Sequence, residues 1–450
     1  MEHECGIIGV SDSYCNDYII PNLKKLQHRG YQSAGISYID NNIQTFKKLG
    51  LVDDVFSNFE FTAEVNNCIG HVRYSTRKKT DDLTMLEEAQ PITGKLNNKI
   101  FALVHNGNIP TINKIKEEYN INSTNNSDSY ILTQLIEILY QKYNNMEDIL
   151  KYIVNKISGA YALLILHNNS IYAIRDRFGI RPLLIGKSNS GYCFVSESIA
   201  LDHYTYFREV NPGEIIKCNS TNLVTIYQSN NINPSFCSFE YIYFMDSVSN
   251  RNSTTVSNIR YKMGYELGKT EKLNNNLNNP IVLSIPTSSI YGAKGFADAN
   301  NLPYKEYILK NENINRTFII ANEEERRAIC EKKFYLLENK LVNQDVFLVD
   351  DSIVRSTTCK TIIAKLKKAQ VKSIHIRIFS PPVTNPCYFG IDFSIDSELI
   401  AHNRSLQEIQ KELGVDSIRY LDLNIMKNIF QEPVCTSCFT GNYNRELLDW

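Results

Sequence analysis

A strand, a loop, a helix and a second strand follow one another in the second half of the chain. Residues 345–349 (Asp-Val-Phe-Leu-Val) are typical of a buried strand, and residues 357–368 have the apolar spacing of an amphipathic helix. The alternating residues Ile374, Ile376 and Ile378 then predict another strand. Because a strand, helix and strand in succession form a βαβ unit, we expect a parallel sheet here.

The first half of the chain has short apolar runs separated by turns. Residues 160–166 and 170–174 flank an Asn-Asn pair and predict a β-hairpin, and residues 183–186 and 192–195 predict another. Helical spacing extends over residues 129–140. We therefore expect a core of two sheets with helices outside.

A mostly polar stretch at residues 230–233 separates these two patterns, so we place a domain boundary there. The predicted domains are residues 5–230 and 231–450. A chain of 450 residues is long enough for two large domains of this kind.

The net charge of -1 argues against binding to nucleic acid or to anionic membranes through bulk charge. No run of about 18 apolar residues predicts a membrane span, and the first residues resemble neither a secretory signal nor a transit peptide. We therefore expect a cytoplasmic, reducing location. There, 11 cysteines favour a metal, a cluster or catalysis over disulfides.

The loop between strand and helix, residues 349–358, carries acids followed by hydroxyls. The adjacent Asp350 and Asp351 can bind a divalent ion or ribose hydroxyls. Hydroxyls and backbone N–H groups that open a helix can hold a phosphate. A simple helix N-cap with acids in the first turn is the alternative.

Cys5 lies close to the start of the chain, before a short apolar run. If Met1 to Glu4 were removed, Cys5 would carry a thiol and a free α-amine, whose pKa of roughly 8 suits a base for the thiol. A small buried residue at the start of a strand is the alternative.

The segments around Cys5 and after it, taken in order, resemble the glutaminase domain of class II glutamine amidotransferases. The resemblance implies an N-terminal nucleophile hydrolase fold, which is a four-layer αββα sandwich. The segments that carry the resemblance are residues 5–7, 26–35, 70–76, 105–108, 127–129, 175–182 and 194–198.

By this resemblance, Cys5 attacks the side-chain amide of glutamine. Asn106 and the backbone N–H of Gly107 would hold the developing oxyanion. Arg73 would pair with the α-carboxylate of glutamine, and Asp128 would pair with its α-amine.

The second half resembles type I phosphoribosyltransferases, with a parallel sheet flanked by helices, and the whole chain resembles the amidophosphoribosyltransferase family. The segments that carry the resemblance to the amidophosphoribosyltransferase family are residues 240–244, Lys310 with 316–319, 348–358, 376–382, 387–392 and 435–441. It implies that ammonia from glutamine displaces diphosphate from 5-phosphoribosyl 1-diphosphate. The product, 5-phosphoribosylamine, is the first intermediate of de novo purine synthesis.

The resemblance also assigns the second site. Magnesium (Mg2+) would be served by Ser288, Asp350 and Asp351, and residues 316–319 would belong to a mobile loop over the substrate. The residues expected to cradle the 5′-phosphate are Ser352, Ile353, Val354, Arg355, Ser356, Thr357 and Thr358.

Four cysteines have positions that suit a metal centre: Cys237, Cys387, Cys435 and Cys438. Four thiolates suit tetrahedral zinc or an iron–sulfur cluster, and their spacing does not decide between the two. The resemblance favours a 4Fe-4S cluster. The remaining cysteines, which include Cys15 and Cys68, are expected to be ordinary thiols.

The resemblance further implies a homo-oligomer, a tetramer or a dimer, regulated by purine nucleotides. Several positions depart from the family pattern. Ser356 stands where Gly is usual, although a Cβ disfavours positive φ, and Thr287 stands where an acid is usual. Milder departures are Asn315, residues 245–249 and the position after Thr76. The alternative functions are another class II amidotransferase, which would share the first half only, and a non-catalytic regulatory binder descended from the enzyme.

Overall fold

The computed structural model describes residues 5–74, 81–273, 276–311, 331–393 and 395–448. These residues form two compact units. The N-terminal unit contains the described residues up to Cys237 together with Tyr388–Asp392 and those from Tyr443 onward, and the C-terminal unit contains Ser238–Cys387 and Phe393–Asn442. Within the described ranges, no helix has the length and apolar character needed to cross a membrane.

Antiparallel sheets form the centre of the N-terminal unit. One sheet has the strand order β11 (Thr205–Glu209), β9 (Leu184–Lys187), β10 (Tyr192–Val195), β1 (Gly6–Ser11), β4 (Asn67–Arg73), β2 (Ser33–Asp40) and β3 (Asn42–Leu49). The other has the order β13 (Asn222–Gln228), β12 (Glu214–Asn219), β8 (Ser170–Arg175), β7 (Ala160–His167), β6 (Lys99–Asn108) and β5 (Ile92–Leu96).

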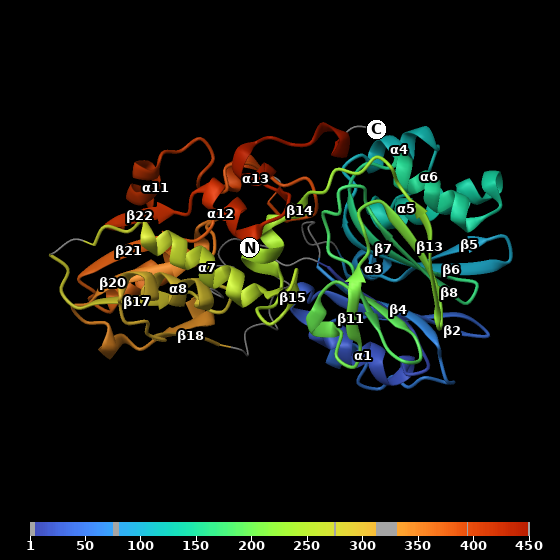
Figure 1. Ribbon diagram of the computed structural model, residues 1–450, viewed down its shortest axis with the longest axis horizontal. Coiled ribbons are helices and arrows are strands. Elements are labelled where there is room, and N and C mark those ends of the chain that lie inside the picture. The colour runs from blue at the N-terminus through green and yellow to red at the C-terminus, as the bar shows by residue number, and fades with distance from the viewer. Residues whose placement is uncertain (1–4, 75–80, 274–275, 312–330, 394, 449–450) are drawn as a thin grey trace. The chain divides into compact units, whose positions relative to one another are not determined.

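Helices cover the outer face of each sheet (Figure 1). On the first sheet they are α1 (Cys15–Lys25) and α2 (Val52–Val55), and on the other they are α4 (Ile112–Glu118), α5 (Asp128–Tyr143) and α6 (Met146–Lys156). A further short helix, α3 (Asp82–Glu87), precedes β5. Side chains alternate along each strand, so that Ile7 of β1 packs between the sheets while Ile8 packs against α1. In β6, Ala102 packs between the sheets and Leu103 packs against α5 and α6. These layers confirm the predicted αββα sandwich.

The predicted local elements of this unit are also confirmed. β7 and β8 form an antiparallel hairpin in which His167 pairs with Ser170, and β9 pairs with β10 in the same manner. Helix α5 begins at Asp128, because the hydroxyl of Ser127 accepts a hydrogen bond from the N–H of Tyr130 and caps the first turn.

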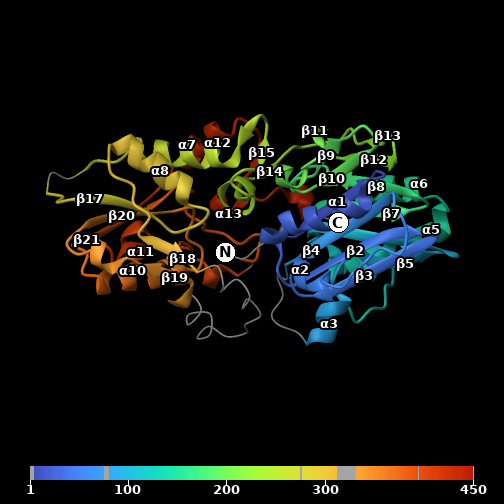
Figure 2. The ribbon, with the colours of Figure 1, turned by 90° about the horizontal axis from the view of Figure 1, so that it is seen from below.

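The C-terminal unit is built on a parallel sheet with the strand order β17 (Pro280–Ser284), β20 (Asp345–Asp350), β21 (Ser373–Ile378) and β22 (Ser417–Tyr420). Figure 2 shows α7 (Val256–Lys269) and α8 (Ile290–Asn300) on one face, with α10 (Thr357–Lys368) and α11 (Leu406–Leu413) on the other. The predicted strand, helix and strand are therefore confirmed as β20, α10 and β21, and the parallel pairing of β20 with β21 confirms the βαβ unit.

Shorter elements complete the described chain. They are η1 (Gln27–Arg29), η2 (Ser198–Ala200), β14 (Phe236–Cys237), η3 (Glu240–Phe244), β15 (Asn250–Arg251), β16 (Thr254–Thr255), β18 (Ile308–Lys310), β19 (Phe334–Leu336), η5 (Glu338–Lys340), η6 (Asp396–Glu398), α12 (Leu423–Phe430), β23 (Val434–Cys435), α13 (Ser437–Thr440) and η7 (Arg445–Leu447).

Two of the remaining cysteines meet in the fold. Cys15 at the start of α1 and Cys68 in β4 lie side by side, with their Cα atoms 6.8 Å apart. The two residues are separated by 53 positions and meet only because α1 packs on the sheet that contains β4. Spacing along the chain carries no information about such a tertiary contact.

Candidate active site

Cys5 lies directly before β1, at the same end of the sheet as Arg73, the last residue of β4. The pairing of Gly6 with Val72 fixes this arrangement. The half-buried Cys5 donates a weak hydrogen bond from Sγ to the carbonyl oxygen of Tyr74, at 3.7 Å. The expected nucleophile and the expected carboxylate-binding group are therefore brought to one edge by strand register. Met1 to Glu4, whose removal the sequence analysis considers, lie outside the described residues.

A buried ion pair holds the backbone of Cys5. Arg29 donates from Nε to the carbonyl oxygen of Cys5 at 3.0 Å and from Nη1 to Glu197 at 2.6 Å. His28 Nε2 lies 2.8 Å from the same carboxylate oxygen. Although burial alone would raise the pKa of Glu197, His28 and Arg29 hold it well below its usual range. Glu197 is therefore a fixed negative charge that orients Arg29.

The expected oxyanion donors lie in β6. Asn106 is 1% exposed, and among the described residues its Nδ2 has no hydrogen-bond partner. A buried, unpaired donor is costly, so it fits a site that a reacting oxygen fills. Gly107 has φ +147°, and a Cβ there would lie 1.9 Å from the carbonyl oxygen of Ala160. Only glycine fits beside this donor.

Asp128 stands at the N-terminus of α5, where its carboxylate accepts hydrogen bonds from the N–H groups of Ser129 at 2.7 Å and Ile109 at 3.2 Å. His105 Nδ1 lies 3.6 Å from Asp128 Oδ2. Burial favours a raised pKa for Asp128, but His105 and these backbone donors outweigh it and lower the pKa. Asp128 is therefore an anion at neutral pH, as an ammonium-binding group requires.

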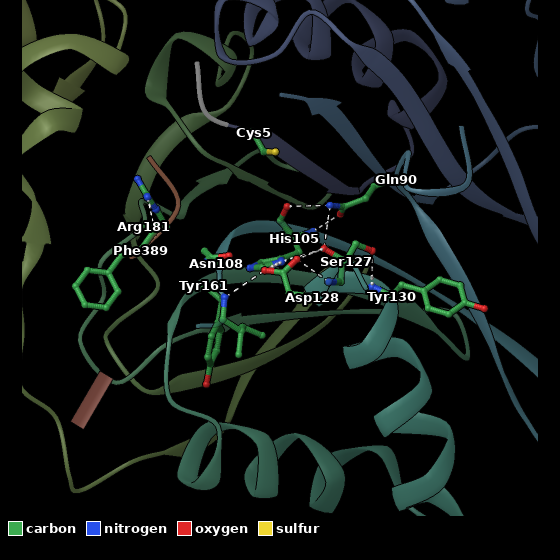
Figure 3. Close-up of polar contacts among 12 residues, drawn as sticks. Cys5, Gln90, His105, Asn108, Ser127, Asp128, Tyr130, Tyr161, Arg181 and Phe389 are labelled. Atoms are coloured by element: carbon green, nitrogen blue, oxygen red, sulfur yellow. Dashed lines mark hydrogen bonds and ion pairs between the residues drawn. The ribbon is translucent and has the colours of Figure 1, made fainter. Parts of the chain in front are cut away.

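Arg73 is nearly buried and is already held by other groups. Its Nη2 forms an ion pair with Glu88, and its Nη1 donates to the carbonyl oxygen of Met85 at 3.3 Å. Glu88 is not predicted from the sequence, and neither is the buried polar network that Gln90, His105 and Ser129 form. Figure 3 shows Gln90 and His105 of this network. Their only sequence signal is that His105 directly precedes the Asn106–Gly107 pair.

A segment from late in the sequence packs on this edge of the N-terminal unit, to which it belongs. Asn108 Nδ2 donates to the carbonyl oxygen of Tyr388 at 2.7 Å, and the hydroxyl of Tyr74 donates to Asp392 at 3.3 Å. Arg181 donates to the carbonyl oxygen of Phe389 (Figure 3). This segment thus anchors Tyr74, which follows Arg73, and Asn108, which follows Gly107.

The predicted acids of the second site lie at the carboxyl end of β20 in the C-terminal unit. Asp351 accepts hydrogen bonds from the hydroxyls of Ser288 and Ser352, each at 2.5 Å, and Asp350 accepts one from the N–H of Asp351 at 3.0 Å. Burial raises the pKa of both carboxyls, and for Asp350 the neighbouring Asp351 raises it further. Two buried carboxylates and a hydroxyl are hard oxygen donors, which fit Mg2+.

Residues 352–358, the loop that is predicted to bind the 5′-phosphate, join this edge to α10. Ser356, its N-cap residue, has φ +61°, so the structure places a serine in the left-handed conformation that favours glycine. The side chains of Ile353 and Val354 are buried in the core, which leaves only their backbone for a ligand. Arg355 forms an ion pair with Glu398, with Nε 2.7 Å from the carboxylate. Residues 316–319, the expected mobile loop, lie outside the described residues.

The four cysteines of the predicted centre are divided between the units. Cys237 belongs to the N-terminal unit, whereas Cys387, Cys435 and Cys438 belong to the C-terminal unit. There, the N–H of Asn385 donates to the carbonyl oxygen of Cys438 at 3.0 Å, which joins the two cysteine-bearing segments. Across the part of the chain that the structure describes, no three His, Cys, Asp or Glu side chains are grouped to hold a metal ion.

Known proteins resemble this chain over almost its full length. Residues 75–203 match a family model described as a glutamine amidotransferase domain. The amidophosphoribosyltransferase of Methanocaldococcus jannaschii is 34% identical, with 98% of this chain and 98% of the relative covered. That of Bacillus subtilis is 34% identical over 99% of this chain and 95% of the relative. The chain belongs to the amidophosphoribosyltransferase family.

A solved structure agrees with this assignment. The glutamine phosphoribosylpyrophosphate amidotransferase from B. subtilis, complexed with ADP and GMP, has a TM-score of 0.86 and 34% identity to this chain, and the match covers 98% of this chain and 97% of that one. As a member of the family, the chain is a glutamine-dependent pentosyltransferase that acts on glutamine and 5-phosphoribosyl 1-diphosphate. It performs the first step of purine biosynthesis.

Proposed function

We propose that the family reaction is divided between residues 5–230, which release ammonia from glutamine, and residues 231–450, which join it to the pentose. Two observations support this proposal. The register of β1 and β4 brings Cys5 and Arg73 to one edge of the sheet. Hydrogen bonds of His105 to His71 and Ser129 link β4, β6 and α5 beside Asn106 and Asp128.

In the first step, the thiol of Cys5 attacks the side-chain amide carbon of glutamine, with its own α-amine as the base once Met1 to Glu4 are removed. Asn106 Nδ2 and the N–H of Gly107 stabilise the negative oxygen of the tetrahedral intermediate. Its collapse releases ammonia and leaves a thioester on Cys5, which water hydrolyses to glutamate. Asp128 pairs with the α-ammonium of glutamine, and Arg73 pairs with its carboxylate.

In the second step, ammonia attacks C1 of the diphosphate sugar, and diphosphate leaves. Residues 352–358 hold the 5′-phosphate with hydroxyls and with backbone N–H groups at the start of α10. Asp350, Asp351 and Ser288 would hold Mg2+, and the ion would supply positive charge beside the departing diphosphate. The geometry supports this role, because both carboxylates are buried at the end of β20 and the hydroxyl of Ser288 lies 2.5 Å from Asp351.

For the four cysteines, we propose a 4Fe-4S cluster held by Cys237, Cys387, Cys435 and Cys438. The Cys-x-x-Cys spacing of Cys435 and Cys438, and the hydrogen bond that joins their turn to the segment before Cys387, support it. Iron and sulfide analysis of anaerobically purified protein tests the proposal. About four of each per chain is the expected result, and zinc without sulfide contradicts it.

Two further properties are proposed from the solved relative. Because the B. subtilis enzyme is complexed with ADP and GMP, purine nucleotides are proposed as regulators of this chain. A homo-oligomer, a tetramer or a dimer, is proposed as well. Light scattering tests the oligomeric state, and inhibition of product formation by GMP tests the regulation. The cytoplasmic location stays a prediction.

The roles of the two halves are tested by substituting the nucleophile. Cys5→Ala removes the thiol, so product formation with glutamine is expected to fall to background, while formation with ammonium stays within about twofold. Cys218→Ala, in β12 of the same unit, is the matched control and is expected to keep both activities. A Cys5→Ala enzyme that still hydrolyses glutamine at its full rate contradicts the assignment.

The alternative, a regulatory binder without activity, is tested with the unsubstituted protein. Calorimetry measures binding of 5-phosphoribosyl 1-diphosphate, and a diphosphate-release assay with ammonium measures turnover. Binding with turnover is the expected result. Binding without turnover would favour the binder, for which the departures at Thr287 and Ser356 are the specific observations.

A further inference from the structure

A short segment between α3 and β5 contacts the elements that carry each glutamine-binding group of the proposed site. The segment is Glu88, Ala89 and Gln90, called the 88–90 segment below. Glu88 and Gln90 are both 5% exposed, so their polar groups interact with protein rather than with water. None of the three residues is proposed to touch the substrate.

The side chain of Gln90 makes the hydrogen bonds that a longer β5 would make with its backbone. The pairing of Ile92 with Leu103 places Gln90 opposite His105 when the register is continued by two residues. Instead of its backbone, Gln90 uses its side-chain amide. Its Oε1 accepts from the N–H of His105 at 2.6 Å, and its Nε2 donates to the carbonyl oxygen of His105 at 3.4 Å. The amide thereby extends the pairing of β6 to the residue that precedes Asn106.

The carbonyl group of His105 is fixed from a second side. His71 Nε2 lies 3.1 Å from this oxygen, and burial lowers the pKa of His71 to about 3, so the ring is neutral and Nε2–H is the donor. Because His105 C=O and Asn106 N–H share one planar peptide, fixing this oxygen also fixes the backbone that presents Asn106 and Gly107.

Gln90 also ties this strand to the helix that carries Asp128. Its Nε2 donates to the hydroxyl of Ser129 at 3.1 Å, and His105 Nδ1 lies 3.0 Å from the same oxygen. Ser129 is the neighbour of Asp128 in the first turn of α5. Figure 3 shows Gln90, His105 and Asp128 in this network. One side chain therefore holds both the oxyanion strand and the amine-binding helix.

Glu88 holds the third group from the same segment. Glu88 lies two residues before Gln90, and its carboxylate pairs with Nη2 of Arg73. The backbone between them is anchored, because Lys47 donates from Nζ to the carbonyl oxygen of Ala89. The carbonyl oxygen of Gln90 lies 2.4 Å from where a Cβ of Gly35 would stand, so β2 packs directly against the segment.

We propose that Glu88 and Gln90 are positioning residues that set the distance between the oxyanion hole and the groups that bind the α-carboxylate and α-amine of glutamine. The site would thereby select a side chain of the length of glutamine over that of asparagine, which is shorter by one methylene. This inference rests on the proposed roles of Arg73, Asn106, Gly107 and Asp128, and it adds residues that touch no substrate.

The test compares isosteric substitutions in the full-length enzyme. Gln90→Met keeps the volume but removes all of the amide hydrogen bonds, so kcat for glutamine hydrolysis is expected to fall on the order of 100-fold. The preference for glutamine over asparagine, as a ratio of kcat/KM values, is expected to fall about tenfold. Glu88→Gln is expected to raise KM for glutamine about tenfold, the effect of one hydrogen bond to a charged group, with kcat nearly unchanged.

Two controls separate positioning from general damage. Gln134→Met makes the same substitution in α5 at a side chain whose Oε1 has no hydrogen-bond partner among the described residues, and it should leave kcat and the preference unchanged. Gln90→Glu keeps the acceptor for His105 N–H, loses the donor to Ser129 and should show an intermediate loss. If Gln90→Met does not fold, Gln90→Glu alone must still lower the preference for glutamine.

Several outcomes would overturn the inference. The first is a Gln90→Met enzyme with an unchanged preference for glutamine. The second is a Gln90→Met enzyme whose kcat falls no further than that of Gln134→Met. The third is a Glu88→Gln enzyme whose KM for glutamine falls. Failure of the proposed function is seen separately, because it appears as glutaminase activity in Cys5→Ala, which leaves the 88–90 segment intact.

Discussion

At the scale of single residues, buried charges of the N-terminal unit hold the backbone of Cys5, the proposed nucleophile. Glu197 and Arg29 form an ion pair in which each side chain is fully buried, and Arg29 donates to the backbone of Cys5. A buried pair of this kind contributes little to stability overall, but removal of one partner leaves the other charge unpaired. The pair therefore serves mainly to orient Cys5.

Glu197→Gln removes this charge with little change in shape. The free energy of unfolding is expected to fall by about 3 kcal/mol, because Arg29 stays buried without its counter-charge. Chemical denaturation of the variant and the wild type measures the difference. We also expect a lower kcat for glutamine, because Arg29 no longer holds the carbonyl group of Cys5. Unchanged stability and unchanged kcat would contradict this role.

The pH dependence of this difference follows from the pKa of Glu197, which folding lowers from its usual 4.5. The stability that the carboxylate contributes is fully present above that value and is lost as pH falls through the lower pKa of the folded state. The difference in the free energy of unfolding between the wild type and Glu197→Gln is therefore expected to be constant from about pH 8 to pH 5. It is expected to become smaller in more acidic solution. A difference in the free energy of unfolding that grows on acidification would contradict the lowered pKa of Glu197.

At the scale of elements, the sequence predicts those helices and strands that depend on residues close together in the chain. The βαβ unit around α10 was predictable because its apolar periodicities and its loop of acids and hydroxyls lie within 34 consecutive residues, Asp345 to Ile378. The position of the Gln90 amide opposite His105 was not predictable. It depends on the register of β5 and β6 and on Pro91, which has no N–H to donate. Similarly, nothing in the spacing of Cys15 and Cys68 reveals that α1 covers β4.

The N-cap of α10 offers a prediction at this scale. Ser356 adopts φ +61°, a conformation that costs a residue with a Cβ roughly 1–2 kcal/mol, part of which the greater freedom of unfolded glycine offsets. Ser356→Gly is therefore expected to raise the free energy of unfolding by about 0.5–1 kcal/mol. Thermal denaturation measures the change.

Ser352→Gly, in the same loop, is the control for this prediction. Ser352 lacks a positive φ and donates its hydroxyl to Asp351 at 2.5 Å, so its replacement is expected to destabilise the protein. If Ser356→Gly were destabilising as well, the hydroxyl of Ser356 would contribute more than its strained backbone costs.

At the scale of the whole molecule, the chain joins an αββα unit to a unit with a parallel sheet, and its family joins glutamine hydrolysis to pentose transfer. The sequence segments between Cys5 and residue 198 that resemble a glutaminase domain, together with the acidic loop at Asp350, were sufficient to predict this combination. Glu88 and Gln90, which contact the proposed glutamine-binding groups, could not be predicted from the sequence, because their contacts are tertiary.

The central claim is that the mature chain begins at Cys5, whose thiol and α-amine act together on glutamine. Intact-protein mass spectrometry of enzyme purified with full glutamine-dependent activity tests it most directly. We predict a mass that lacks Met1 to Glu4, and a covalent adduct on the peptide that begins with Cys5 after treatment with an electrophilic glutamine analogue. A fully active enzyme that retains all four residues would contradict the account.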